Sequence, residues 1–501
     1  MISVAPRPHS RPRPRRARFG AALALAALCA VPASSRAQAT PLVTVTPAHV
    51  RGILSALADD SMEGRGTGMP GSMRAARFIA QQMRDAGLVP AGDSGYFQHV
   101  PMVHRMFDIA SSISVDGTTL QALRDFVASP GRGALPRAID GVQVIYGGVA
   151  GDTANPLTAD QVRGKLVVLA PAETQGRGRR RGGFAGMAAL GQAAGVATIA
   201  GVELPDAVVR GATARPGAIL VLDPNAPPTS GGPLSLTVTS RAADVLLGTP
   251  VAQATKGMAG RTVHGGARFV DTPALGGNVV GILPGSDPVL SSEVVLIDAH
   301  YDHLGMRTPA TPGADSIYNG ADDDGSGTTA VLEIARVMKA GPAPKRTVVF
   351  VTTTGEEVGL LGTNWYIAHP VRPLADMVAN LEIEMIGRPD SLAGGPGRAW
   401  LTGFERSTMG QEFAAAGLPI VPDRRPEQQF FQRSDNIAFA RMGIPAHTLS
   451  TFNLHDDYHQ VSDEVSKVDF DHMAGVINAA VQAVALLANG PKPHWNAGGK
   501  P

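Results

Sequence analysis

The sequence contains a single cysteine, Cys29, among 501 residues. Cys29 lies in an N-terminal segment that we expect to be cleaved off, so the mature chain has no thiol. Its fold then depends on a packed core rather than on disulfides. A metal site in the mature chain would have to use imidazole and carboxylate ligands, because no thiolate is present.

An excess of charge of either sign is also missing. The formal net charge is +1, but residues 1–39 hold seven arginines and no acidic residue. The remaining residues carry 37 basic and 43 acidic side chains, a net charge of −6. A mildly acidic chain is poorly suited to the phosphate backbone, so we expect no nucleic-acid partner.

Long apolar runs are absent as well. Residues 19–31 are apolar but fall short of the roughly 20 residues that a membrane span needs. The arginines before them and Ala37-Gln38-Ala39 after them predict a signal peptide over residues 1–39. We therefore expect a periplasmic or extracellular protein with no stable membrane anchor after cleavage, exported by the Sec or the twin-arginine route. Residues 476–487 are interrupted by polar side chains and predict a packed terminal helix.

The pattern of the remaining chain predicts an α/β domain. Thr46-Pro47 is a helix start, and apolar residues at helical spacing follow over residues 50–57 and again over 75–86. From Gly277 onward, β-type and helical segments alternate, which predicts a mostly parallel sheet flanked by helices. We assign residues 40–137 and 273–490 to this domain and residues 491–501 to a tail.

Residues 138–272 have a different character. Short β-type runs alternate with Gly and Pro, and residues 187–201 form a helix-like patch, which together predict a smaller β-rich insert. The basic run at residues 177–183 suggests an anionic-ligand patch, although such runs are usually solvated loops. No catalytic pattern is evident in this insert.

Polar residues gather where the apolar segments after Gly277 end. Strand alternation puts His300 and Asp302 on one side, so Asp302 can accept from one ring nitrogen while the other binds a metal ion. Asp322, Asp323 and Asp324 follow at a helix start, where we expect Gly-Ser-Gly to expose them. A bridging cation would relieve their repulsion more fully than solvation or helix capping.

Glutamates complete the set of candidate ligands. Glu356 and Glu357 follow a β-branched segment, so that one can bind metal while the other moves a proton. Glu382 and Glu384 lie in an apolar stretch, where a carboxylate is costly unless it is paired or metal-bound. The alternation puts both on one face, and spacing does not choose between them.

Two further residues lie in loops. His459 offers a second imidazole after an apparent strand, whereas Arg65, in a glycine-rich loop, fits a solvated loop residue. Each of these patterns alone also has an ordinary structural explanation. Their combination on one sheet edge, where ligands bind in open α/β sheets, indicates a metal-dependent hydrolase.

The order of these motifs resembles the M28 family of co-catalytic zinc peptidases. The resemblance rests on HYDHLG, GADDDGSGTTAVLEIAR, TGEEVGLLG, NLEIEMIGR, RSDN and DYHQVSD, and on the region of residues 57–90. The insert is similar to a protease-associated (PA) domain. The resemblance implies a zinc exopeptidase-like α/β fold with a mostly parallel sheet, interrupted by a PA-like β-rich domain.

The resemblance also implies roles and two Zn²⁺ per chain. One ion would be held by His300 and Glu384, the other by Glu357 and His459, with Asp323 bridging them. Glu356 would be the general base and acid that takes the proton of the water, and the hydroxide held between the ions would be the nucleophile. Asp302 would be the partner of His300. Tyr458 would donate to the oxyanion.

This sequence departs from the family pattern at two positions. Glu384 stands where many members have Asp, and Asn436 stands where His is common, which we expect to alter the substrate pocket. Phe430 and Phe431 are candidates for that pocket.

From the resemblance we expect a secreted aminopeptidase acting on peptide or protein substrates. The alternatives are a carboxypeptidase or glutaminyl cyclase of the same fold, or a non-catalytic receptor-like relative. The side chain preferred at the cleaved bond, the role of the insert and the oligomeric state stay open.

Overall fold

The computed structural model describes residues 43–130, 137–152, 156–171, 189–214, 217–221, 232–309 and 311–501. The predicted signal peptide and the basic run at residues 177–183 lie outside the described residues. Residues 43–501 form one unit by their contacts, separate from residues 1–42.

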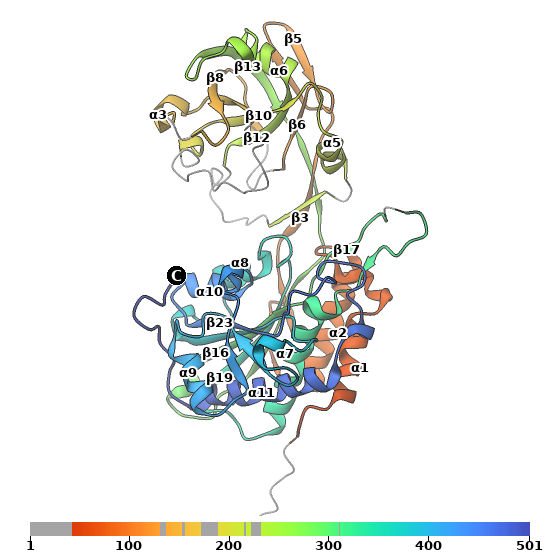
Figure 1. Cartoon of the computed structure of the whole chain (residues 1–501), viewed down its shortest axis with the longest axis vertical. Helices are drawn as coiled ribbons and strands as arrows, with labels where there is room; N and C mark the ends of the chain where they lie inside the picture. The colour runs from red at the N-terminus through yellow and green to blue at the C-terminus, as the bar shows by residue number, and fades with distance from the viewer. Residues whose placement is uncertain are drawn as a thin grey trace, which may run out of the picture. The chain divides into compact units, whose positions relative to one another are not determined.

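A mixed sheet forms the centre of the part that carries the site (Figure 1). Its strands β16, β19, β20 and β23 are parallel neighbours, whereas β15 pairs antiparallel with β19, and β1 and β2 pair antiparallel with β15. Strand β21 is antiparallel to β23 and parallel to β22. In sheet order the bounds are β1 Val89–Pro90, β15 Gly277–Leu283, β19 Thr347–Thr353, β16 Val294–His300, β20 Met377–Ile383, β23 Ala446–Ser450, β21 Ala399–Leu401 and β22 Ile420–Pro422, with β2 at Phe97–His99 beside β15.

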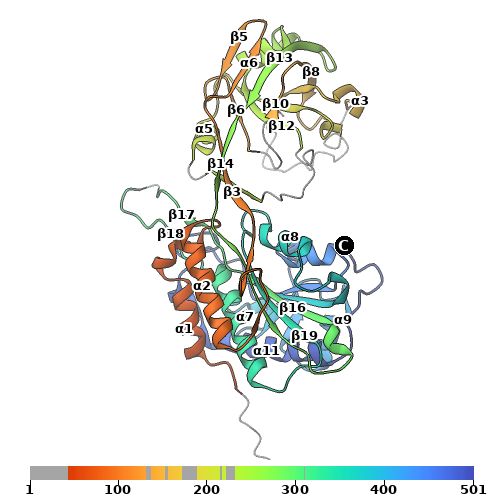
Figure 2. The ribbon, with the colours of Figure 1, turned by 180° about the vertical axis from the view of Figure 1, so that it is seen from behind.

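Helices cover both faces of this sheet, as the mostly parallel pattern predicts (Figure 2). One face packs against α1 Pro47–Leu57, α2 Pro70–Asp85, α7 Gly327–Ala340 and α11 Phe470–Asn489. The other packs against α8 Leu361–Ala368 and α10 Asn436–Arg441, and α9 Thr408–Ala415 lies against β22. The predicted fold class, a mostly parallel α/β sheet flanked by helices, is confirmed.

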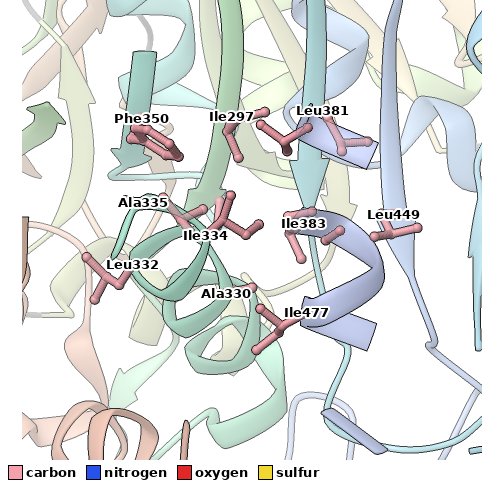
Figure 3. Packing of buried hydrophobic residues seen from close by; sticks show 14 of the residues in the cluster. Ile297, Ala330, Leu332, Ile334, Ala335, Phe350, Leu381, Ile383, Leu449 and Ile477 are labelled. Carbon is pink, nitrogen blue, oxygen red and sulfur yellow. The ribbon is translucent and has the colours of Figure 1, made fainter. Parts of the chain in front are cut away.

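Alternate residues of the strands pack into two apolar layers, one on each face of the sheet. Ile297 and Phe350 join Ala330, Ile334 and other residues of the helix α7 layer in one core (Figure 3). Their neighbours along the strands, such as Leu296 and Val349, enter the core on the opposite face. This period-2 division is why the strands are apolar on both sides.

The terminal helices follow their sequence signals. Thr46 caps α1 through its hydroxyl, which accepts from the His49 N–H at 3.3 Å, and the predicted apolar residues of α1 are buried. Helix α11 is apolar and long enough to cross a membrane, but most of it is buried against α1 and α7. It is therefore a core helix, as its polar interruptions predict.

A second sheet has its own apolar core. Strands β8, β9, β10 and β12 are parallel, and antiparallel strands flank them. Its order is β5 Thr118–Gln121, β4 Ser112–Val115, β13 Ala259–Ala267, β8 Val142–Val149, β9 Leu166–Ala170, β10 Gly195–Gly201, β12 Leu234–Thr239 and β6 Phe126–Ala128, with β7 Arg137–Ala138 beside β13. Its helices are α3 Ala159–Val162, α5 Asp206–Thr213 and α6 Ser240–Leu247.

Two features of this sheet differ from the sequence-based expectation. Strands β4, β5 and β6 pair in it although they precede residue 138, where we predicted the insert to begin. Residues 195–201, which we expected to continue a helix, form the parallel strand β10. The likeness of the insert to a PA domain stays a prediction.

Two small sheets complete the described part. Strand β3 Met102–Phe107 pairs antiparallel with β11 Ala218–Val221 and β14 Phe269–Pro273. Strands β17 Gly305–Met306 and β18 Ile317–Tyr318 form a hairpin between the HYDHLG and GADDDG motifs. This hairpin and the short 3₁₀ turn Asp60–Arg65 lie beside the candidate site.

Candidate metal centre

The candidate ligands come from the carboxyl ends of adjacent parallel strands. His300 is the last residue of β16, Glu356 and Glu357 follow β19, and Glu384 follows β20. Asp323 lies in the π-helical turn Ala321–Ser326 that precedes α7. The order of the sheet thus gathers residues that are far apart in the sequence at one edge.

His300, Asp323 and Glu384 form a first group whose ligand atoms all lie within 4.8 Å of one another. His300 Nε2 is 3.4 Å from Asp323 Oδ1. Two ligands of a tetrahedral zinc ion, each about 2.0–2.1 Å from it, lie about 3.3 Å apart, which this spacing matches.

A second group shares Asp323. His459 Nε2 lies 3.1 Å from Asp323 Oδ2 and 3.2 Å from Glu357 Oε2. His303, which the sequence analysis did not single out, also belongs here, because its Nδ1 lies 2.8 Å from Glu357 Oε1. Asp323 therefore directs one carboxylate oxygen to each group.

Several buried atoms of these residues have no hydrogen-bond partner within the described part of the chain. They are Asp323 Oδ2, Glu357 Oε1, His300 Nε2 and both ring nitrogens of His303. An unsatisfied buried polar atom costs about 1–3 kcal/mol. Metal coordination would satisfy them, and imidazole nitrogens with carboxylate oxygens are a ligand set that zinc accepts. The residues present thus fit a metal centre.

The charges of the site perturb one another strongly. Burial raises the pKa of Glu384 to about 8, and the neighbouring Glu382 adds to the shift. Burial also raises the pKa of Glu356 well above its usual value. For Asp323, burial acts in the same direction, but the surrounding imidazoles outweigh it and hold its pKa well below the usual value. A cation among these carboxylates would stabilise their ionised forms.

The structure separates Glu382 from Glu384, which the sequence could not do. The Glu382 carboxylate accepts from the Ser434 and Thr448 hydroxyls and from the N–H groups of Asp435 and Asn436. It is fully buried and saturated with donors, so it has no position left for a metal ion. Glu384 instead faces His300 and Asp323.

The Asp triplet is buried, not exposed as we expected. Main-chain N–H groups donate to its outer members: Gly387 donates to Asp322 at 2.6 Å, and Gly327 donates to Asp324 Oδ1 at 2.9 Å. Asp463 accepts from the N–H of Asp323 at 3.0 Å and fixes the turn. Asp322 also contacts His455, whereas the Asp323 side chain is directed at His300, His303 and His459.

Asp302 supports the site differently from the prediction. Its carbonyl oxygen, 3.1 Å from His300 Nδ1, accepts from the imidazole, whereas its carboxylate is 3.8 Å away. That carboxylate accepts from the Thr67 hydroxyl at 2.5 Å and from the Glu356 N–H at 3.2 Å. Asp302 therefore orients His300 through its main chain and Glu356 through its side chain.

A pocket opens beside the two groups. Tyr458 lines it and stacks on the His459 ring, with 3.9 Å between the ring centroids. Phe430 lines it, as predicted, but Phe431 and Asn436 do not. The full lining is Asp323, Glu356, Glu384, Met385, Trp400, Thr402, Phe430, Arg433, Thr448, Ser450, Phe452, Tyr458 and His459. The pocket is thus aromatic on one side and carboxylate-lined on the other.

Phe431 and Asn436 have structural roles instead. Phe431 packs in the core behind α10, edge-on to Trp495. The Asn436 side chain donates to the Phe431 carbonyl at 3.2 Å. The expectation that Asn436 alters the pocket directly is wrong, because its side chain holds the loop rather than facing the cavity.

Arg65 was predicted to be a solvated loop residue, and this prediction is wrong. Its side chain is 0% exposed. The guanidinium donates over 2.6–2.9 Å to four carbonyl oxygens, those of Leu57, Tyr301, Asn319 and Gly320. Arg65 therefore ties together the loops that precede His303 and the Asp triplet.

Glycines explain how the loops of the site approach so closely. A Cβ at Gly64 would lie 2.4 Å from the Tyr318 carbonyl oxygen, and one at Gly66 would lie 3.0 Å from the Gly305 Cα. The glycine-rich loop is thus a packing requirement that brings Arg65 under the site.

A sequence comparison matches the part of the chain that contains these residues. The profile described as "Peptidase family M28" matches residues 278–484, which contain His300, Asp323, Glu357, Glu384 and His459. Residues 278–484 belong to peptidase family M28.

Two curated relatives are similar to part of this chain. Aminopeptidase YwaD of Bacillus subtilis (strain 168) is 34% identical over 111 residues, 22% of this chain and 22% of its own length. Leupeptin-inactivating enzyme 1 of Streptomyces exfoliatus is 32% identical over 181 residues, 35% of this chain and 36% of its own length. The matches thus span a minor part of each relative.

A solved structure aligns over more of the chain. The aminopeptidase from Aneurinibacillus sp. strain AM-1 covers 89% of this chain and 95% of its own, with 18% identity and a TM-score of 0.48.

Proposed function

We propose that this M28 family member is a secreted aminopeptidase with two zinc ions per chain. The observation that carries the proposal is the pair of ligand groups that share Asp323, with buried donor and acceptor atoms that lack hydrogen-bond partners within the described residues. Zinc at such a site supplies a Lewis acid for the scissile carbonyl and activates water at neutral pH.

The residues around the ligands have distinct tasks in this proposal. Glu356 lines the pocket next to both groups, takes a proton from the attacking water and passes it to the leaving amine. Burial raises its pKa, which favours its acceptance of a proton. Tyr458, which lines the pocket, would donate its hydroxyl proton to the oxyanion.

The pocket supports removal of N-terminal residues. Trp400, Phe430 and Phe452 form an apolar wall for a substrate side chain. Glu356, which belongs to neither ligand group, gives a free α-ammonium group a favourable environment. An apolar N-terminal residue is therefore the substrate end that fits best.

A carboxypeptidase is the second candidate, because Arg433 also lines the pocket. Its guanidinium carbon lies 5.1 Å from the centre of the Phe430 ring, and it could pair with a C-terminal carboxylate. Glu356 favours the aminopeptidase, since its carboxylate is not bound to a metal ion in this proposal and would repel that group.

The proposed secretion depends on residues 1–39, whose pattern is that of a signal peptide. Periplasmic or culture-fluid location of the full-length chain, with cleavage after residue 39, is the expected outcome. An intact N-terminus in the cytoplasm would remove this part of the proposal.

Glu356→Gln tests the catalytic assignment. The substitution keeps the size of the side chain but removes its ability to take a proton, so turnover should fall by about 10²–10⁴-fold. Zinc content, measured on the same purified protein, should be unchanged because Glu356 belongs to neither ligand group. Undiminished turnover in this variant would show that another group carries the proton.

A further inference from the structure

His303 has no role in the family-based ligand assignment, yet it lies inside the second ligand group. It is three residues after His300 in HYDHLG and is 1% exposed. Its ring packs against Gly320, where a Cβ would come within 2.6 Å of the His303 Cδ2 and Cγ atoms. The absence of a side chain at Gly320 is what lets the imidazole reach the site.

The His303 ring approaches two carboxylates of the second ligand group. Nδ1 lies 2.8 Å from Glu357 Oε1 and 3.8 Å from Asp323 Oδ2. At 2.8 Å a correctly oriented N–H would form a strong charge-assisted bond. Nevertheless Nδ1, Oε1 and Oδ2 all lack a partner of acceptable hydrogen-bond geometry among the described residues. A metal ion among these atoms would give each of them a partner.

The spacing of these atoms suits coordination of a metal ion. Ligand atoms of His303, Asp323 and Glu357 all lie within 4.8 Å of one another. His459 approaches the same two carboxylates from another side, through Asp323 Oδ2 and Glu357 Oε2, and the two imidazole rings are 5.7 Å apart. Glu357 thus presents one oxygen to each histidine.

We propose that His303 is a direct ligand of the second metal ion, together with Asp323, Glu357 and His459. This inference rests on the proposed two-zinc function and extends it. The two centres would then be unequal: the first has one imidazole, from His300, and the second has two. Imidazole is a ligand that suits zinc better than magnesium or calcium. The second centre, with two imidazoles, should therefore retain its zinc more tightly than the first centre.

Zinc affinity of His303→Gln, measured by competition with a chromophoric chelator, tests the proposal. Loss of a residue that only orients a ligand typically weakens binding by about 10–100-fold, so loss of a direct ligand should weaken the second ion by about 100-fold or more. His455→Gln is the matched control. His455 Nε2 lies 3.1 Å from Asp322 Oδ2, outside both ligand groups, so its loss should change affinity by less than about threefold.

X-ray absorption at the zinc edge of the wild-type protein separates a ligand from an orienting residue and needs no variant. We expect three imidazoles for two zinc ions, from His300, His303 and His459, and a count of two would overturn the inference. Equal zinc affinity of wild type and His303→Gln would also overturn it. A wild-type chain that binds only one zinc ion would instead refute the two-zinc function, and comparison with the variant would still show whether His303 holds that ion.

Discussion

Replacement of Arg65 by Met should destabilise the chain more than the loss of most single side chains. Arg65 gives four hydrogen bonds to carbonyl oxygens and lies fully buried, with burial lowering its pKa and Asp463 and Asp323 opposing that shift. Methionine fills similar space but leaves the carbonyl groups of Leu57, Tyr301 and Asn319 without a donor, whereas Gly320 still accepts from the Gly325 N–H at 3.2 Å. Each orphaned group costs about 1–3 kcal/mol, so even at the low end the loss is about 3 kcal/mol.

Thermal unfolding monitored by circular dichroism measures this loss. For a domain of about 300 residues 1 kcal/mol shifts Tm by about 1.5 °C, so Arg65→Met should lower Tm by about 4 °C or more. Arg74→Met is the control, because Arg74 donates to the Ser61 carbonyl and pairs with Glu63 while 37% exposed. Its Tm should change by no more than about 2 °C. Equal midpoints for the two variants would refute the role of Arg65.

Two further predictions concern the pocket and a buried histidine. Trp400→Ala should raise KM for leucyl and phenylalanyl amides by about tenfold or more, with little change for alanyl amide. Phe431→Ala is the control, because Phe431 does not line the pocket, and it should not alter the ratio of KM for these amides to KM for alanyl amide. Burial lowers the pKa of His447 to about 4 in the folded chain, whereas an unfolded histidine has a pKa of about 6.5. As the pH falls from about 6.5 towards 4, His447 is protonated in the unfolded chain before the folded chain, so the free energy of unfolding decreases. His447 should contribute about 2 kcal/mol of this loss by pH 5, and urea unfolding of His447→Gln at pH 7 and pH 5 should show a correspondingly smaller pH dependence.

The residues of the metal centre were accessible to sequence reasoning because they follow strands. Three apolar segments end in His300, Glu356-Glu357 and Glu384, and parallel strands bring such ends to one edge. The choice between Glu382 and Glu384 was not accessible, since it depends on donors from Ser434 and Thr448. Alternation along one strand contains no information about those partners.

Other residues were misjudged for similar reasons. Arg65 is buried only because carbonyl groups more than 230 residues away, at Tyr301 and Asn319, accept its protons. The strand β10 has buried and half-buried residues and an alanine-rich flank, so its pattern did not separate it from a helix. His303 is adjacent to a recognised ligand, but whether it faces the metal centre depends on the space left by Gly320.

Hydrolysis by the purified mature chain tests the central claim most directly. Aminoacyl amides with a free N-terminus should be cleaved, N-blocked peptides with a free C-terminus should not, and a chelator should abolish cleavage until zinc is restored. Cleavage of the blocked peptides alone would favour the carboxypeptidase candidate. Cleavage that persists after complete removal of metal, or no cleavage of either set by the zinc-loaded chain, would contradict the account.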